Sequence, residues 1–244
     1  MIKTKVLTLV LAISCSVICF SQQLKIDHVI AVVSDLEASI QNYTDKGFTV
    51  KKGRVHNNGL LNAHIKFQNG TSYELMTIKD TPKDEIAKAY AQLLSEKEGG
   101  VYIALSGMST EDMAAQLDLI NIDFKLIEGN NWNYIVFEGT ALSHFFFIDY
   151  KVKSSEAENI TSHKNKSTRI KEVSTTGSAL TFDFLDAFFD KHSPVENNAN
   201  GKGIKYKSTT GGILVFKNDS IDRHRLLSME FGAKSPNNKL IITY

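Results

Sequence analysis

The chain has 244 residues, of which 42% are hydrophobic and 23% charged, an ordinary composition for a globular protein. Its formal net charge is +1 at pH 7, with neither a basic excess nor an acidic tail, which argues against a nucleic-acid-binding protein. The length suffices for one large or two small domains.

Residues 1–21 have the pattern of a secretory signal peptide. Lys3 and Lys5 form a positively charged start, the apolar stretch 6–20 follows, and Ser21 is a small residue after which we expect cleavage. The apolar stretch falls short of the roughly 20 residues that a membrane-spanning helix needs. We therefore expect an exported protein, periplasmic or secreted, with no stable membrane span after cleavage.

Both cysteines, Cys15 and Cys19, lie inside the signal segment. The mature chain would then lack cysteine, which excludes disulfides, thiol catalysis and cysteine metal ligands. The sequence also lacks a glycine-rich phosphate loop in a strand–helix context and a Gly-x-Ser-x-Gly motif. These exclusions favour a small-molecule ligand and no nucleic acid as partner.

A strand, a helix and three further strands are predicted between residues 24 and 80. The apolar run 26–33 is typical of a strand, and Ser34 to Glu37 reads as a capping box at the start of a helix. Gly47 lies where that helix would end, and Asn69-Gly70 is a hairpin signal. The remaining strands are predicted over 48–52, 64–67 and 72–78.

A second helix is predicted over 83–98, and the first pattern then returns at 101–151. The offset is about 75 residues, so that Ser34 corresponds to Ser109 and Glu74 to Asp149. Repeated units of this kind usually pack on each other to close a core. The pattern therefore predicts an α+β fold of two βαβββ modules.

The rest of the chain is less regular. Residues 153–169 are polar with almost no apolar anchor, which predicts a linker or exposed loop. Residues 170–244 contain a predicted helix over 180–192 and several strands. We interpret them as a partial third α+β module, packed on the same domain.

Four motifs together carry a family resemblance. They are Ile26-Asp27-His28-Val29, the segment GRVHNNGLLN at 53–62, Tyr73-Glu74-Leu75-Met76 and Phe147-Ile148-Asp149-Tyr150. In this order and spacing they resemble the glyoxalase-like domain proteins of the vicinal oxygen chelate superfamily, which also holds bleomycin resistance proteins and dioxygenases. The resemblance is good over 24–78, fair over 101–151 and weak beyond 170.

The resemblance implies a glyoxalase-like domain over 24–152, whose modules form a curled mixed sheet with an open cleft for the ligand. In metal-using members the ligands come from the first and last strands of both modules, here His28, Glu74 and Asp149. They would hold one divalent ion, Zn, Mn, Ni, Co or Fe. Glu74 or Asp149 would also act as the catalytic group that moves a proton. The implied activity is a lyase or isomerase acting on a small substrate with vicinal oxygens.

One departure from the family pattern keeps a second hypothesis open. The fourth ligand position falls on Ile103, next to Tyr102, and neither residue is a good ligand at neutral pH. The alternative is therefore a metal-free module that binds or sequesters a small molecule. In either case His56 and Asn62 would contact the ligand at a polar rim, and Tyr102 and Trp132 would form apolar walls.

Each of these residues also has a purely structural interpretation. His28 could be a core histidine, Glu74 could point to solvent through strand alternation, and His56 and Asn62 could order their own loop. The sequence leaves open whether the protein is an enzyme and whether it forms a homodimer.

Overall fold

The computed structural model describes residues 24–152, 157–197, 201–217, 226–233 and 240–244. The predicted signal peptide therefore lies outside the described residues. Within them, no helix has both the length and the apolar character needed to cross a membrane.

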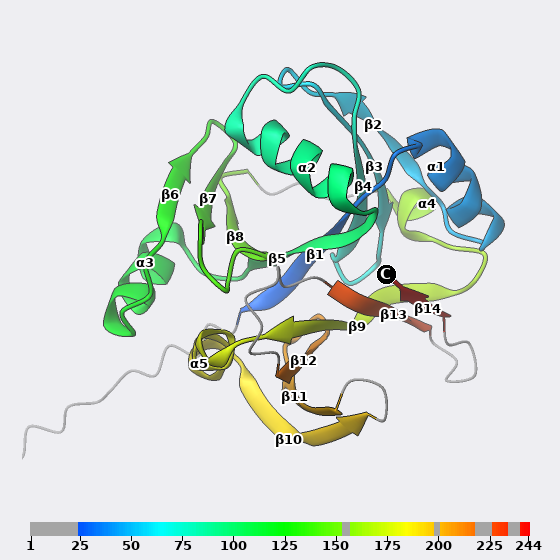
Figure 1. Ribbon diagram of the computed structural model, residues 1–244. Helices are drawn as coiled ribbons and strands as arrows, with labels where there is room; N and C mark the ends of the chain where they lie inside the picture. Colours follow the sequence, from blue (N-terminus) through cyan, green and yellow to red (C-terminus); the bar gives the residue numbers. More distant parts are fainter. Residues whose placement is uncertain (1–23, 153–156, 198–200, 218–225, 234–239) are drawn as a thin grey trace, which may run out of the picture.

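Two βαβββ modules build the larger sheet (Figure 1). The first consists of β1 (Lys25–Val32), α1 (Leu36–Asp45), β2 (Lys51–Val55), β3 (Leu60–Lys66) and β4 (Ser72–Ile78). The second consists of β5 (Gly99–Ser106), α3 (Thr110–Leu119), β6 (Lys125–Glu128), β7 (Trp132–Val136) and β8 (Phe145–Tyr150). The predicted α+β class with paired modules is thus confirmed.

The modules join through their first strands. The strand order is β2-β3-β4-β1-β5-β8-β7-β6, with β1 antiparallel to β5 and each first strand parallel to the last strand of its own module. Val29 pairs with Ile103, and the flanking pairs are His28–Ala104 and Ile30–Tyr102. This pairing is symmetric about Val29 and Ile103, so the two halves of the sheet are related by an approximate two-fold axis.

A third module follows the same plan. It consists of β9 (Ser167–Gly177), α5 (Ala179–Phe188), β10 (Asp190–Asn197), β11 (Gly201–Lys207) and β12 (Gly212–Lys217). β12 runs parallel to β9, and β13 (Leu226–Ala233) runs antiparallel to it, just as β4 and β5 flank β1. β14 (Leu240–Thr243) completes a six-stranded sheet of order β10-β11-β12-β9-β13-β14.

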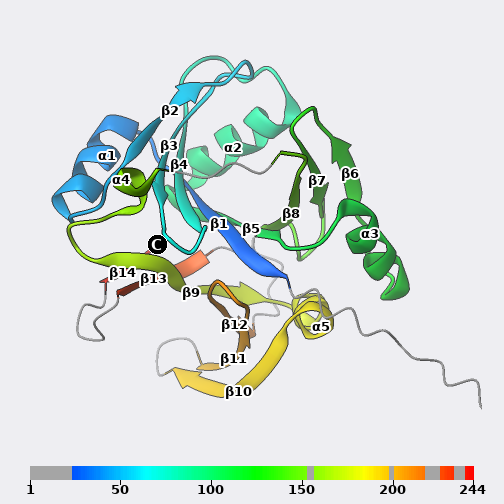
Figure 2. The same cartoon turned by 180° about the vertical axis from the view of Figure 1, so that it is seen from behind.

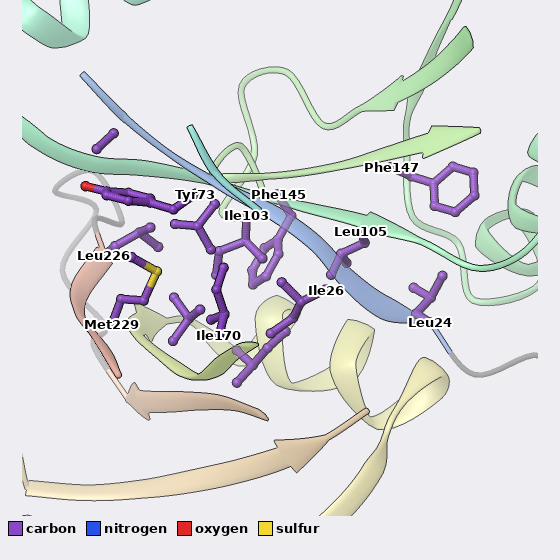
Figure 3. Close-up of a cluster of buried hydrophobic side chains, with 14 of the residues drawn as sticks. Leu24, Ile26, Tyr73, Ile103, Leu105, Phe145, Phe147, Ile170, Leu226 and Met229 are labelled. Atoms are coloured by element: carbon purple, nitrogen blue, oxygen red, sulfur yellow. The ribbon is translucent and has the colours of Figure 1, made fainter. Parts of the chain in front are cut away.

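The two sheets pack against each other through one apolar core. Ile26, Ile103 and Phe145 of the larger sheet point toward Ile170 and Met229 of the smaller one (Figure 3). All five side chains are almost fully buried. Because side chains alternate along a strand, the neighbours of these residues point to the opposite, concave face of the larger sheet.

The helix α2 (Glu85–Glu96) lies inside the curve of the larger sheet, whereas α1 and α3 lie outside it (Figures 1 and 2). Its Ala87 and Tyr90 pack on Ile30, Val32 and Met76 in a second, smaller apolar cluster. The connection between the two modules therefore closes one end of the concave face.

The start of α1 differs by one residue from the prediction. Asp35, and not Ser34, is the N-cap: its carboxylate accepts a hydrogen bond from the Ala38 backbone N–H. The backbone N–H and the hydroxyl of Ser34 both donate to Glu98 instead. In the second module Ser109 caps α3 as predicted, so the two helix starts are 74 residues apart.

Part of the predicted linker is packed against the first module. It contains α4 (Glu158–Thr161) and then His163, whose ring lies between Phe48 and Phe67. His163 Nδ1 accepts a hydrogen bond from the Thr49 N–H at 3.0 Å, and Nε2 donates to the Lys66 carbonyl at 3.0 Å. His163 therefore anchors the described part of this segment on the first module, because its ring satisfies two backbone groups there, while most of the neighbouring side chains are exposed.

Candidate functional site

Four polar side chains meet on the concave face of the first module. They are His28 of β1, Asn62 and His64 of β3 and Glu74 of β4. Because side chains alternate along a strand, their neighbours Val29, Ala63 and Leu75 point the other way, into the core between the sheets. The strand register then brings them together, because His64 lies opposite Glu74 and β1 is the other neighbour of β4. His28, Asn62 and Glu74 are all buried.

His28 is held by its neighbour in the chain. Its Nδ1 lies 2.7 Å from Asp27 Oδ1, and because a carboxylate only accepts, Nδ1 donates. Asp27 also accepts hydrogen bonds from the Tyr150 hydroxyl and the Ser106 hydroxyl, both at 2.9 Å. The opposite ring nitrogen, Nε2, lies 3.7 Å from Glu74 Oε2. The imidazole ring therefore lies between two carboxylates, with Asp27 at Nδ1 and Glu74 at Nε2.

The electrostatics of this arrangement favour a charged imidazole. Burial lowers the pKa of His28, but the hydrogen bond and charge of Asp27, with the charge of Glu74, outweigh it and raise the pKa above the usual value. Burial likewise raises the pKa of Asp27, and its bonds to His28, Tyr150 and Ser106 reverse that and lower it. Both shifts indicate an imidazolium–carboxylate pair.

Asn62 links Glu74 to His64. Its amide nitrogen donates to Glu74 Oε1 at 2.7 Å and lies 3.0 Å from His64 Nε2. The amide oxygen accepts a hydrogen bond from the Arg54 N–H at 3.3 Å. Burial lowers the pKa of His64, although the nearby Glu74 opposes this, so a neutral ring with an accepting Nε2 fits the contact.

A chain of aromatic rings covers the other half of the concave face. Phe146 of β8 lies 5.6 Å from His28 and makes edge contacts with Tyr102 and Tyr134. The chain extends to Tyr90 of α2, 5.4 Å from Tyr102, and to Trp132, 6.3 Å from Tyr134. The cleft thus has a polar half from the first module and an aromatic half from the second module and α2.

A pocket of about 1180 Å³ opens beside this cluster. Asp27 at the start of β1, Ser72 at the start of β4 and Tyr150 at the end of β8 are among its lining residues. Asp27 is hydrogen-bonded to His28, and Ser72 lies on the same face of β4 as Glu74. The pocket therefore borders the polar cluster through Asp27, at the edge of the sheet.

The predicted site residues are only partly brought together. His28, Glu74 and Asn62 belong to the polar cluster, and Tyr102 and Trp132 belong to the aromatic half. His56 lies elsewhere, in a smaller hollow of about 350 Å³ with Arg54 and Asp84.

Asp149 does not join His28 and Glu74, which corrects the predicted set of three metal ligands. Its Oδ2 accepts hydrogen bonds from the Thr110 N–H at 3.1 Å and the Thr110 hydroxyl at 3.0 Å, at the first turn of α3. That helix lies outside the curve of the sheet (Figure 1). Phe146, by contrast, faces the cleft, so Asp149 lies on the alternate face of β8.

The cleft positions of the second module hold aromatic residues. The approximate two-fold axis relates His28 to Tyr102 and Ile30 to Ala104. It therefore also relates Glu74 to Phe146, because Ile30 pairs with Glu74 in the first module and Ala104 pairs with Phe146 in the second. Among the described residues, no group of three or more histidine, cysteine or acidic side chains is arranged to hold a metal ion. The donor set that the family resemblance implies therefore does not fit a divalent metal in this chain.

Asp27 and Tyr134 are among the site residues that sequence reasoning missed. Asp27 precedes His28 directly in the chain, and a carboxylate next to a candidate histidine was an available signal. Tyr134 follows Trp132 at the strand spacing of two, so it shares the face predicted for Trp132.

Comparisons with known proteins agree with this architecture. Residues 26–182 match the glyoxalase-like domain family. A hypothetical protein from Staphylococcus aureus has a similar structure, with 16% identity and a TM-score of 0.57 over 83% of this chain and 88% of its own. At this identity the likeness shows the fold alone.

Shorter solved structures match part of the chain. Methylmalonyl-CoA epimerase from Streptomyces coelicolor, in complex with 2-nitronate-propionyl-CoA, is 17% identical, and the match covers 55% of this chain and 99% of the epimerase with a TM-score of 0.41. The epimerase from Mycobacterium tuberculosis is 18% identical over 52% of this chain and 88% of its own, also with a TM-score of 0.41. No curated protein matches the chain. Because the domain match spans more than half of the sequence, the chain belongs to the glyoxalase-like domain family.

Proposed function

We propose that the protein binds a small molecule with vicinal oxygens in the concave cleft and moves a proton on it, as a lyase or isomerase. The observation that carries this proposal is the line Asp27–His28–Glu74. A histidine oriented by one carboxylate and facing a second carboxylate is an arrangement suited to acid–base chemistry. A pocket of about 1180 Å³ that Asp27 lines lies next to this arrangement.

In this proposal one atom acts as the hydrogen-bond donor and another as the general base. His28 Nε2 donates a hydrogen bond to a carbonyl oxygen of the substrate, and Glu74 Oε2 accepts the proton from the adjacent carbon. The carbon–hydrogen bond breaks, its electron pair forms the enolate, and the imidazolium stabilises the charge that develops on oxygen. The proton then returns to the same carbon or a neighbouring atom. No step uses a metal, because the donor set does not fit one.

Hydrogen exchange tests this proposal without knowledge of the natural substrate. The chain from Gln22 would be incubated in D₂O with a panel of small hydroxyketones and diketones, and deuterium uptake at carbon would be followed by NMR. We expect uptake above the protein-free rate for at least one compound, and a loss of about 10²–10⁴-fold in His28→Gln and Glu74→Gln. Exchange that both variants retain would overturn the assignment of the two residues.

The aromatic half of the cleft favours a second candidate function. Tyr102, Phe146, Tyr134 and Trp132 form a continuous apolar wall of the kind that binds rather than transforms a ligand. The protein would then sequester a small molecule. Saturable quenching of Trp132 fluorescence by a compound that shows no enhanced deuterium uptake would support this function over the first.

We also propose that the protein is exported. The support is the pattern of residues 1–21, a positive start followed by an apolar stretch and Ser21. N-terminal sequencing of the mature protein after expression of the full chain should begin at Gln22. A mature protein that still begins at Met1 in the cytoplasm would refute export.

A further inference from the structure

The amide of Asn62 lies at the centre of the polar cluster. Its nitrogen carries two hydrogens, and two acceptors lie within reach, Glu74 Oε1 at 2.7 Å and His64 Nε2 at 3.0 Å. An amide nitrogen only donates, so both acceptors must present a lone pair to it. These are the same lone pairs that a cation between Glu74 and His64 would need.

The orientation of the amide is fixed from the other side. Its oxygen accepts the Arg54 N–H, so the nitrogen cannot exchange places with it without losing that bond. The pairing of β2 with β3 is irregular between Lys52 and Val55, and this irregularity brings the Arg54 N–H to Asn62. At Gly53 an added Cβ would lie 1.9 Å from Asn62 Oδ1, so only glycine allows this close approach.

We propose that Asn62 replaces a divalent cation: its amide bridges Glu74 and His64, and the cleft works as a metal-independent site. Asn62 is then a positioning residue, which fixes Glu74 Oε1 and leaves Oε2 facing His28. His28 Nε2 faces that oxygen at 3.7 Å and takes the electrostatic role that a metal would otherwise have. That role rests on the proposed function, whereas the Asn62 bridge does not depend on any substrate.

The surroundings of the bridge support this inference independently. A tight site for a transition metal needs three or four converging protein ligands. The second module places Tyr102 and Phe146 at the cleft positions equivalent to His28 and Glu74, and Asp149 is engaged by Thr110. Among the described residues, the histidines and the carboxylate of the polar cluster come from the first module, and Asn62 occupies one lone pair on each of His64 and Glu74.

Metal titration of matched variants tests the proposal. Tag-free, chelator-treated protein from Gln22 onward would be titrated with Zn²⁺, Mn²⁺, Ni²⁺ and Co²⁺ by calorimetry, as wild type, Asn62→Asp and Asn62→Leu. We expect no stoichiometric binding by the wild type and about one equivalent bound by Asn62→Asp, because a carboxylate then joins His64 and Glu74. Asn62→Leu removes the bridge without adding a ligand, so it should bind at least about tenfold more weakly than Asn62→Asp.

Stoichiometric binding by the wild type that is lost in His28→Gln would overturn the proposal, as would a folded Asn62→Asp variant that gains no metal. Should that variant not fold, ¹⁵N NMR of the wild-type histidine rings gives an independent answer. His64 should be neutral with its proton on Nδ1, because Nε2 accepts from Asn62. A proton on His64 Nε2 would contradict the bridge. Neither readout uses a substrate, so both remain informative if the proposed proton transfer fails.

Discussion

Asp27 and His28 are consecutive residues of β1, yet their side chains meet at 2.7 Å. Neighbours in a regular strand point to opposite faces of the sheet. The pairing of β1 with β5 is irregular between Ile26 and His28, and this irregularity allows both side chains to reach each other. The candidate histidine is thus oriented by an irregularity in the strand that carries it.

The first prediction concerns this contact. Asp27→Asn removes the charge that holds the His28 imidazolium, so the pKa of His28 should fall, as measured by NMR titration of its ring protons. Deuterium exchange should slow for the same reason. Ser106→Ala, which removes a hydrogen bond to Asp27 but leaves the carboxylate, is the matched control. An unchanged pKa of His28 in Asp27→Asn would mean that Asp27 does not set the charge of the ring.

The same contact predicts a dependence of stability on pH. The pKa of His28 is raised on folding, so its contribution to the free energy of unfolding is complete below the unfolded value of about 6.5 and is lost as pH rises through the folded pKa. Urea unfolding between pH 6 and pH 9 should show a loss of stability with rising pH that is smaller in His28→Gln. Equal slopes in the two proteins would contradict this assignment.

His163 should act in the opposite direction. Burial lowers its pKa, so the folded protein binds fewer protons there than the unfolded chain, and stability falls as pH drops from about 6.5 through the folded pKa. Protonation would also remove the acceptor of the Thr49 N–H. His163→Gln keeps an acceptor and a donor without titrating, so its stability should vary less between pH 7 and pH 5. A variant with the same loss as wild type over this range would rule out His163 as the group responsible.

Gly53→Ala should disturb the site from outside it. The new Cβ would lie 1.9 Å from Asn62 Oδ1 and 2.5 Å from the Asn62 carbonyl oxygen. These contacts are too short, so β2 would have to move away from the Asn62 amide. We expect a loss of about 1–3 kcal/mol in the free energy of unfolding, typical of overpacking. Arg54→Ala keeps the backbone N–H that Asn62 uses and should stay within about 0.5 kcal/mol of wild type. Similar values for the two variants would show that β2 can move away without cost.

Asp149→Ala separates a structural from a catalytic role. Because Asp149 accepts two hydrogen bonds from Thr110 at the start of α3, the variant should lose about 0.5–2 kcal/mol of stability, as for a helix cap. Deuterium exchange in the folded variant should match wild type, in contrast to Glu74→Gln. A loss of exchange as large as that of Glu74→Gln would mean that Asp149 takes part in catalysis.

The sequence by itself determined the modules, since strand alternation, helix caps and turn signals are local properties of neighbouring residues. The family resemblance, and not the alternation of either strand alone, suggested that His28 and Glu74 share one face. The third module was recognised only in part, because its plan becomes visible in the pairing of β9 with β12 and β13 rather than in its residues.

The tertiary structure decided what faces the cleft in the second module. The N-cap is Asp35 and not Ser34, so the helix starts are 74 residues apart and not 75. A shift of one residue moves every side chain of a strand to the opposite face. The strand pairing places Tyr102, 74 residues after His28, and Phe146, 72 residues after Glu74, on the cleft face. The offset of 75 selected Ile103 and Asp149, which lie an odd number of residues away from them and therefore face the other side. Contacts such as the Asn62 bridge depend on register and strand irregularities across three strands, and local sequence does not specify these.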